Sequence, residues 1–110
     1  MSVSAPKPAS YSVKAAELIV AGGQARLFTL APGESIPWHH HSEITDHYFV
    51  LGGVLTISTR GPDGERELDG GGRFQITPRT AHCLRNRGAT DCQFLLLQGG
   101  GAYDWIKADG

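Results

Sequence analysis

Histidines are the residues of this sequence best suited to chemistry, and four of the five lie within one short stretch. His39, His40 and His41 form a run, and His47 follows it. On an extended strand, residues two apart face the same side. His39 and His41 would therefore project together, with His40 on the opposite side, and two imidazoles on one face can share one metal ion.

A complete metal site needs ligands from more than one segment. Asp46 lies five residues after His41, and after a short turn its carboxylate would sit on the neighbouring strand. His82 is the only histidine outside the first stretch. His47 is an alternative to Asp46, although on an ideal strand it faces away from the site when Asp46 faces inward. A site of three histidines completed by water is a further alternative.

The same histidines also have an interpretation that needs no metal. A single histidine in a strand is most often a hydrogen-bonded core or surface residue, and a triple histidine can be a solvated surface run. Here the run is internal, follows a Pro-Gly turn, and precedes an acidic residue and an apolar strand. The residues taken alone leave both interpretations open.

Short extended segments between glycine-rich turns must position these side chains. We expect strands at residues 12–20, 24–30, 35–41, 46–51, 54–59, 66–68, 73–77, 81–86 and 92–98. Residues 14–18 could instead form one helical turn, and Gly52-Gly53 indicates a hairpin or a bulge. No window of ten or more residues otherwise holds a helical apolar period. The sequence therefore predicts an all-β sandwich or barrel, which closes most simply as a jelly roll.

Strand alternation also predicts which neighbours of the histidines face the interior. Pro37 shares the parity of His39, whereas Ile36 would point with His39 only if a bulge intervenes. Tyr48 shares the parity of Asp46, which makes it an inward-facing residue with a hydroxyl group.

Composition limits the classes of protein to which the chain can belong. The length of 110 residues predicts one domain at 11–110, preceded by an irregular arm at 1–10. A net charge of -1 without a basic stripe argues against nucleic acid and anionic membranes as partners. The longest apolar run, at 94–97, is too short to span a bilayer, and we expect a cytoplasmic protein. Cys83 and Cys92 are expected to be buried free thiols.

Two segments resemble the paired motifs of the cupin family. The first motif is glycine, five residues, His-x-His, three or four residues, an acid that is usually Glu, six residues and glycine. Every spacing of this motif is met by the set Gly33, His39, His41, Asp46 and Gly53.

The second motif, from Gly71 to Asn86, is matched less completely. The four-residue step from His82 to Asn86 is kept, but Thr77 stands where proline is expected and Arg79 replaces a glycine. Together the two motifs and their connector cover residues 33–86, half of the chain. The Asn86 side chain is expected to hold a turn by hydrogen bonding.

The resemblance implies a double-stranded β-helix, or jelly-roll barrel, that holds one divalent transition metal through His39, His41, Asp46 and His82. Such a donor set suits Fe, Mn, Ni, Zn or Cu. Asp is one methylene shorter than the family's usual Glu, so its carboxylate has further to reach. Similarity to single-domain cupins also implies a small-molecule substrate or ligand and a homodimer, with the arm and strand 94–97 available to cover a sheet.

The resemblance to single-domain cupins implies dioxygenase, isomerase, epimerase, lyase or decarboxylase activity. An imidazole-rich site with open positions favours dioxygenase-type chemistry on a substrate chelated to the metal. Tyr48 would orient the ligand or donate a proton as a catalytic residue. The alternatives are a non-redox isomerase or lyase, and a binding or sensing protein without catalysis, so enzymatic activity itself is left open.

Overall fold

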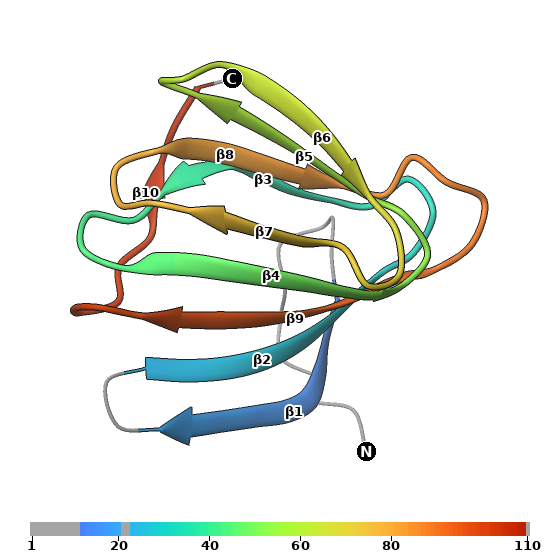
Figure 1. The fold of residues 1–110 in the computed structure, drawn as a ribbon, viewed down its shortest axis with the longest axis horizontal. Coiled ribbons are helices and arrows are strands. Elements are labelled where there is room, and N and C mark those ends of the chain that lie inside the picture. The colour runs from blue at the N-terminus through green and yellow to red at the C-terminus, as the bar shows by residue number, and fades with distance from the viewer. Residues whose placement is uncertain (1–11, 21–22, 110) are drawn as a thin grey trace.

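The described part of the chain consists of strands, turns and loops, arranged as two facing sheets (Figure 1). This computed structural model describes residues 12–20 and 23–109, and the predicted arm at 1–10 lies outside them. Within these ranges no helix is long and apolar enough to cross a membrane.

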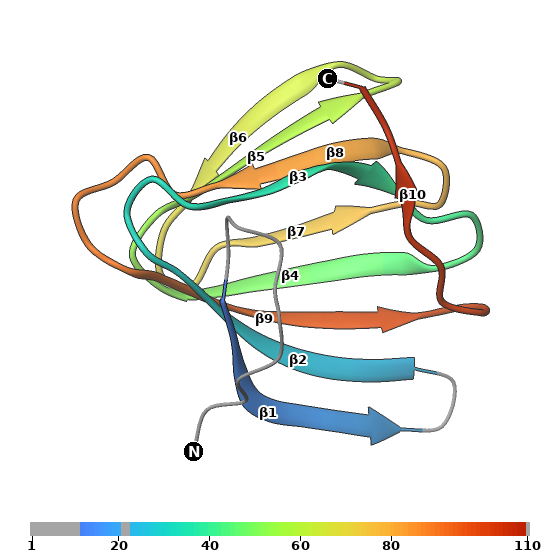
Figure 2. The ribbon, with the colours of Figure 1, turned by 180° about the vertical axis from the view of Figure 1, so that it is seen from behind.

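Within the described residues each sheet contains five strands, and every paired neighbour is antiparallel. Figure 2 shows the two sheets from behind. The order in the first sheet is β1 (Ser12–Val20), β2 (Gly23–Leu30), β9 (Cys92–Gly99), β4 (Thr45–Gly52) and β7 (Arg73–Ile76). The order in the second sheet is β10 (Ile106–Lys107), β3 (Ser35–His40), β8 (Ala81–Arg85), β5 (Leu55–Arg60) and β6 (Gly64–Leu68). The predicted all-β jelly-roll fold is confirmed.

All nine predicted strands are present, with ends within two residues of those expected, whereas the two-residue β10 was not predicted. The alternative of a helical turn at 14–18 is wrong, because β1 continues through it with a shift in its pairing to β2. Gly52-Gly53 does not form a hairpin, because β4 and β5 lie in different sheets. A bulge does occur there, where the pairing of β4 with β9 shifts between Val50 and Gly52.

One apolar core fills the space between the sheets, since alternate residues of their strands face inward. On β4 the buried set is Asp46, Tyr48 and Val50, as alternation predicts. In the first sheet the Phe28 and Phe94 rings stack with centroids 5.2 Å apart. Strand β9 lies in the middle of its sheet, paired on both edges. Residues 94–97, expected to be available to cover a sheet face or edge, therefore cannot cover an edge.

The prediction that Pro37 faces inward is also wrong. Pro37 is exposed and Ile36 is buried, because the pairing of β3 with β8 shifts between Ile36 and His39. We expected Ile36 to face inward with His39 only if a bulge lay between them, and this shift in pairing is such a bulge. A proline has no N–H to contribute to a strand ladder, so it is well accommodated at such an irregularity.

The fully buried side chain of Asn86 ties three backbone segments together. Its Nδ2 donates to the carbonyl oxygens of Leu30 and Thr90, both at 2.8 Å, and its Oδ1 accepts from the N–H of Gly88 at 2.9 Å. The predicted turn-holding role of Asn86 is confirmed.

Cys83 and Cys92 are buried and free of any disulfide, as expected. Burial raises the pKa of the Cys92 thiol to about 11, so this cysteine stays protonated and behaves as a small apolar core residue.

Arg79 occupies the position where the second motif has glycine. It adopts a positive φ of 63°, a conformation that costs a residue with a Cβ more than it costs glycine. Its N–H donates to the carbonyl oxygen of His41 at 2.7 Å, so the turn that carries Arg79 also supports the histidine strand.

We expect Gly53→Ala to lower the free energy of unfolding by about 2 kcal/mol or more. Gly53 has a φ of 72°, and a Cβ there would lie 2.3 Å from the carbonyl oxygen of Asp91. Gly52→Ala is the matched control, because nothing lies within 4 Å of a Cβ at that position. Chemical denaturation measures both variants, and equal losses of stability would contradict this account.

Candidate metal centre

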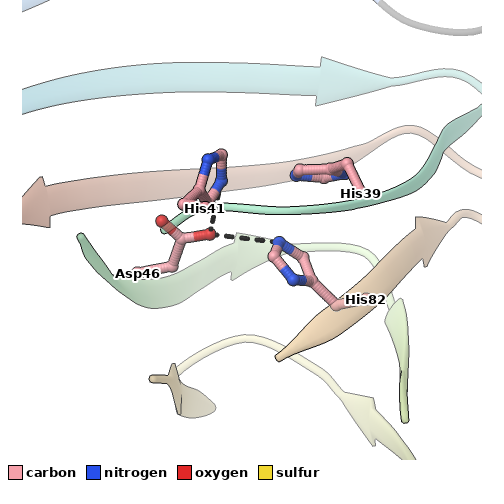
Figure 3. Close-up of side chains that lie close together, drawn as sticks. All are labelled: His39, His41, Asp46 and His82. Carbon is pink, nitrogen blue, oxygen red and sulfur yellow. Dashed lines mark ion pairs between the residues drawn. The ribbon is translucent and has the colours of Figure 1, made fainter. Parts of the chain in front are cut away.

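Four polar side chains meet between the two sheets: His39, His41, Asp46 and His82 (Figure 3). Each offers a potential ligand atom, and these atoms all lie within 4.8 Å of one another. All four residues are at most 3% exposed, so water cannot satisfy their polar atoms freely. His47 lies outside this group. The four predicted residues are therefore together, and the shorter Asp46 reaches the histidines.

The antiparallel register explains this convergence. His39 and His82 are direct partners across β3 and β8 in the second sheet, and His41 follows β3. Asp46 lies near the start of β4 in the first sheet. The end of β3, the start of β8 and the start of β4 share one end of the sandwich, because neighbouring strands run in opposite directions.

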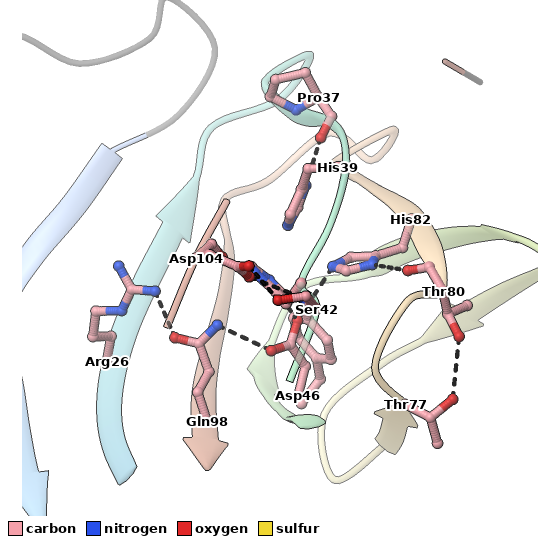
Figure 4. A network of polar contacts seen from close by, with 12 residues as sticks. Arg26, Pro37, His39, Ser42, Asp46, Thr77, Thr80, His82, Gln98 and Asp104 are labelled. Carbon is pink, nitrogen blue, oxygen red and sulfur yellow. Dashed lines mark hydrogen bonds and ion pairs between the residues drawn. The ribbon is translucent and has the colours of Figure 1, made fainter. Parts of the chain in front are cut away.

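Backbone carbonyls fix the tautomer of all three histidines. Each Nδ1 lies within hydrogen-bond distance of a carbonyl oxygen: His39 of Pro37 at 2.7 Å, His41 of Asp104 at 2.5 Å, and His82 of Thr80 at 2.8 Å. Figure 4 shows the contacts of His39 and His82. A carbonyl oxygen can only accept, so Nδ1 must carry the proton and the neutral ring keeps its lone pair on Nε2. This is the tautomer in which histidine binds metals through Nε2.

The Nε2 atoms of His41 and His82 face the carboxylate of Asp46. They lie 3.4 Å and 3.2 Å from its Oδ2, and neither has a hydrogen-bond partner in the described structure. A lone pair directed at a carboxylate oxygen is repelled by it unless a cation lies between them. Three imidazole nitrogens and one carboxylate are also donors that divalent transition metals accept, so these residues fit a metal ion.

The carboxylate of Asp46 is held on both sides. The Tyr48 hydroxyl donates to Oδ2 at 2.8 Å, and the Gln98 side-chain amide donates to Oδ1 at 3.0 Å. Burial alone would raise the pKa of Asp46, but a proton on the facing imidazole of His41 or His82, together with the Gln98 amide, outweighs burial and holds that pKa well below its usual range. Asp46 is therefore ionised and available as an anionic ligand.

Tyr48, the predicted catalytic residue, lies next to the group with its hydroxyl hydrogen-bonded to Asp46. Burial, and then the nearby charge of Asp46, raise the pKa of Tyr48 well above its ordinary value of 10.0. The hydroxyl keeps its proton, so the contact with Asp46 orients the carboxylate.

The pKa values of the two buried rings His39 and His41 shift in opposite directions. Burial, followed by the charge of His82, lowers the pKa of His39 to about 3. Burial also acts to lower the pKa of His41, but Asp46 and the Asp104 carbonyl oxygen prevail and raise it. Without a metal, His41 is the ring of this pair that gains a proton more readily.

A small pocket opens beside the four side chains. Its volume is about 30 Å³, enough for one or two water molecules. The lining residues are Arg26, Phe28, Ile36, His39, His41, Tyr48, Leu84, Leu96, Gln98, Tyr103 and Trp105.

The C-terminal segment closes one side of this pocket, which sequence patterns did not indicate. Trp105 stacks on His39 with ring centroids 3.7 Å apart and planes inclined by 7°, and Tyr103 lies 5.5 Å from the His41 ring. The Asp104 carboxylate accepts hydrogen bonds from the N–H and the hydroxyl of Ser42. The segment has no alternation that could have predicted these contacts, and only the pairing of β10 with β3 places it.

Comparison of the sequence with models of known protein families finds a match to one family. A sequence profile described as a cupin domain matches residues 26–98. No curated protein sequence matches the chain.

Several solved structures share the fold. An uncharacterised conserved protein with a double-stranded β-helix domain from Klebsiella pneumoniae has a TM-score of 0.76 at 20% identity, covering 96% of this chain and 90% of its own. An oxalate oxidase has a TM-score of 0.79 at 20% identity, covering 98% of this chain and 60% of its own. The capsular polysaccharide assembling protein CapF from Staphylococcus aureus has a TM-score of 0.81 at 19% identity, covering 96% of this chain and 34% of its own. This chain therefore spans less than two thirds of the latter two proteins, and the likeness is one of fold.

Protein stripped of metal by a chelator should lose stability as the pH falls from about 6.5 to about 3. Over that range the unfolded chain protonates His39 and the folded chain does not, so this residue contributes at most about 1.4 kcal/mol of loss per pH unit. His39→Gln should flatten the dependence, whereas His40→Gln, outside the group, should leave it unchanged. Chemical unfolding at a series of pH values measures it, and identical slopes for wild type and His39→Gln would refute the assignment.

Proposed function

The chain belongs to the cupin family, and from this premise we propose that His39, His41, Asp46 and His82 hold one divalent transition metal beside a pocket for a small organic molecule. The observation that carries the proposal is the pair of buried, unpartnered Nε2 atoms facing Asp46. Iron, manganese, nickel, zinc and copper all suit this donor set.

The surrounding residues support a metal-dependent enzyme. A bound metal would supply Lewis-acid polarisation and, for iron, manganese or copper, redox chemistry. The chain's own contribution is to orient the imidazoles through carbonyl oxygens and to hold Asp46 through Tyr48 and Gln98. Apolar walls from Phe28, Leu84 and Leu96 keep bulk water away.

Within this class we propose dioxygenase-type chemistry, since an imidazole-rich donor set with open coordination positions suits oxygen and a chelated substrate. Tyr48 would then act as the catalytic residue that keeps a proton beside the reacting atoms. One observation favours the second candidate, a binding or sensing protein: Trp105 stacks over His39 and leaves the pocket little room.

We also propose that the protein forms a homodimer and is cytoplasmic. In the described structure the outer strands of the sheets are β1, β7, β10 and β6, and a second copy would pair with one of these edges. The central β9 cannot serve, since both of its edges are already paired.

Elemental analysis of protein purified without added metal should find about one metal ion per chain. His82→Ala and Asp46→Ala should lose most of this metal, because each removes one ligand from the group. His47→Ala is the matched control and should retain it. Absence of stoichiometric metal from the wild type would refute the proposal, and retention by Asp46→Ala with loss in His47→Ala would reassign the carboxylate ligand.

An oxygen electrode tests the dioxygenase proposal. The iron(II) form, offered a panel of diketones, catechols and thiols, should consume oxygen with at least one compound. Tyr48→Phe should slow oxygen consumption per bound iron about 100-fold, because it removes the hydroxyl proton beside the site but none of the four ligands. No uptake with any compound would leave the non-redox isomerase or lyase and the binding protein as the better accounts.

A further inference from the structure

Arg26 is the one lining residue of the metal pocket with a permanent charge, among those the structure describes. It comes from β2, in the first sheet, whereas the histidines come from β3, the residue after β3, and β8, on the side of the second sheet. The remaining walls are mostly apolar, with Phe28, Leu84 and Leu96 among them. Arg26 is half-buried, and placing an unpaired charge against apolar walls has a free-energy cost.

The strand register ties Arg26 to the candidate metal group through one amide. Gln98 on β9 is the direct partner of Gln24 on one side and of Asp46 on the other, and Arg26 lies two residues after Gln24 on the same face. Arg26 Nη2 donates to Gln98 Oε1 at 2.6 Å, and Gln98 Nε2 donates to Asp46 Oδ1 at 3.0 Å (Figure 4). The amide orientation follows from chemistry, since guanidinium can only donate and the carboxylate can only accept.

The guanidinium of Arg26 is positioned but not neutralised. Its Cζ lies 5.2 Å from the centre of the Phe28 ring and 5.6 Å from that of Tyr103, so two aromatic rings restrict it. Its buried Nε has no hydrogen-bond partner, and no ion pair joins Arg26 to a carboxylate within the described residues. Donors therefore remain for another acceptor.

The charges of the pocket then favour an anion. A divalent metal with Asp46 leaves one net positive charge, and Arg26 adds a second within the same apolar enclosure. We propose that Arg26 is a specificity-determining residue of this pocket, and that its ligand is a small organic carboxylate whose charged group Arg26 binds. The proposal deepens the proposed function and rests on it for the metal's share of the charge. A carboxylate matches a guanidinium geometrically, because its two oxygens can accept two parallel N–H bonds.

Isothermal titration calorimetry tests the proposal with acetate, malonate and succinate, each compared with its neutral amide. Metal-loaded wild type should bind at least one carboxylate about tenfold or more tightly than the matching amide. Arg26→Gln should weaken that carboxylate by about 10- to 100-fold and leave the amide unchanged. Arg26→Lys keeps the charge without the planar fork and should fall between the two. Arg66→Gln is the matched control, because Arg66 is exposed and stacks on Phe74 away from the pocket.

The metal content of every variant is measured in parallel, and it separates the outcomes. Failure of all three carboxylates to bind wild type, or equal binding by Arg26→Gln, overturns the proposal. Loss of metal by Arg26→Gln in step with loss of binding also overturns it, since Arg26 would then only position Asp46. If metal-free wild type binds a carboxylate and metal-free Arg26→Gln does not, the result would support the proposal and refute the proposed function. If Arg26→Gln does not fold, undiminished carboxylate binding by Arg26→Lys overturns the proposal.

Discussion

The contact on which the site depends is that between the Asp46 carboxylate and the imidazole nitrogens of His41 and His82. All three side chains are buried, and the carbonyl oxygens of Asp104 and Thr80 take up the other ring nitrogens. The lone pairs that remain face a negative charge in a region of low dielectric, where such repulsion is strong. A cation relieves this repulsion, either as a proton on His41 or as a metal ion shared by the group. The four side chains could therefore hold a metal ion.

Each of the two sheets supplies different side chains to this site. The second sheet supplies the histidines, which share one end of the sandwich because β3 and β8 run antiparallel and place His39 opposite His82. The first sheet supplies Asp46 and the residues that hold it, Tyr48 and Gln98. The apolar core behind them fixes the distance between the sheets, so packing far from the site controls how closely its donors approach.

A line of polar contacts extends the site across the first sheet, from Asp46 through Gln98 to Arg26. This line links the negative charge of Asp46 to the positive charge of Arg26, which lies in a pocket with mostly apolar walls. On the other side, Trp105 lies flat on His39 and narrows the opening. The two features lie on either side of the pocket: Arg26 contributes its charge, and the C-terminal segment limits its size.

The sequence alone predicted the strands and the inward-facing residues, because these depend on alternation within a strand and on the residues of the turns. Alternation placed His39 with His41 and Asp46 with Tyr48, and the turn chemistry gave nine strands and the jelly roll. Pro37 was misplaced because a bulge is decided by the partner strand, which parity within one strand cannot describe. Arg26, Gln98 and Trp105 carry no local signal, since they meet the histidines only through register between strands distant in the chain. The sequence by itself determined the donors and their faces. The tertiary structure decided which groups surround them, because long-range pairing and burial depend on the whole fold.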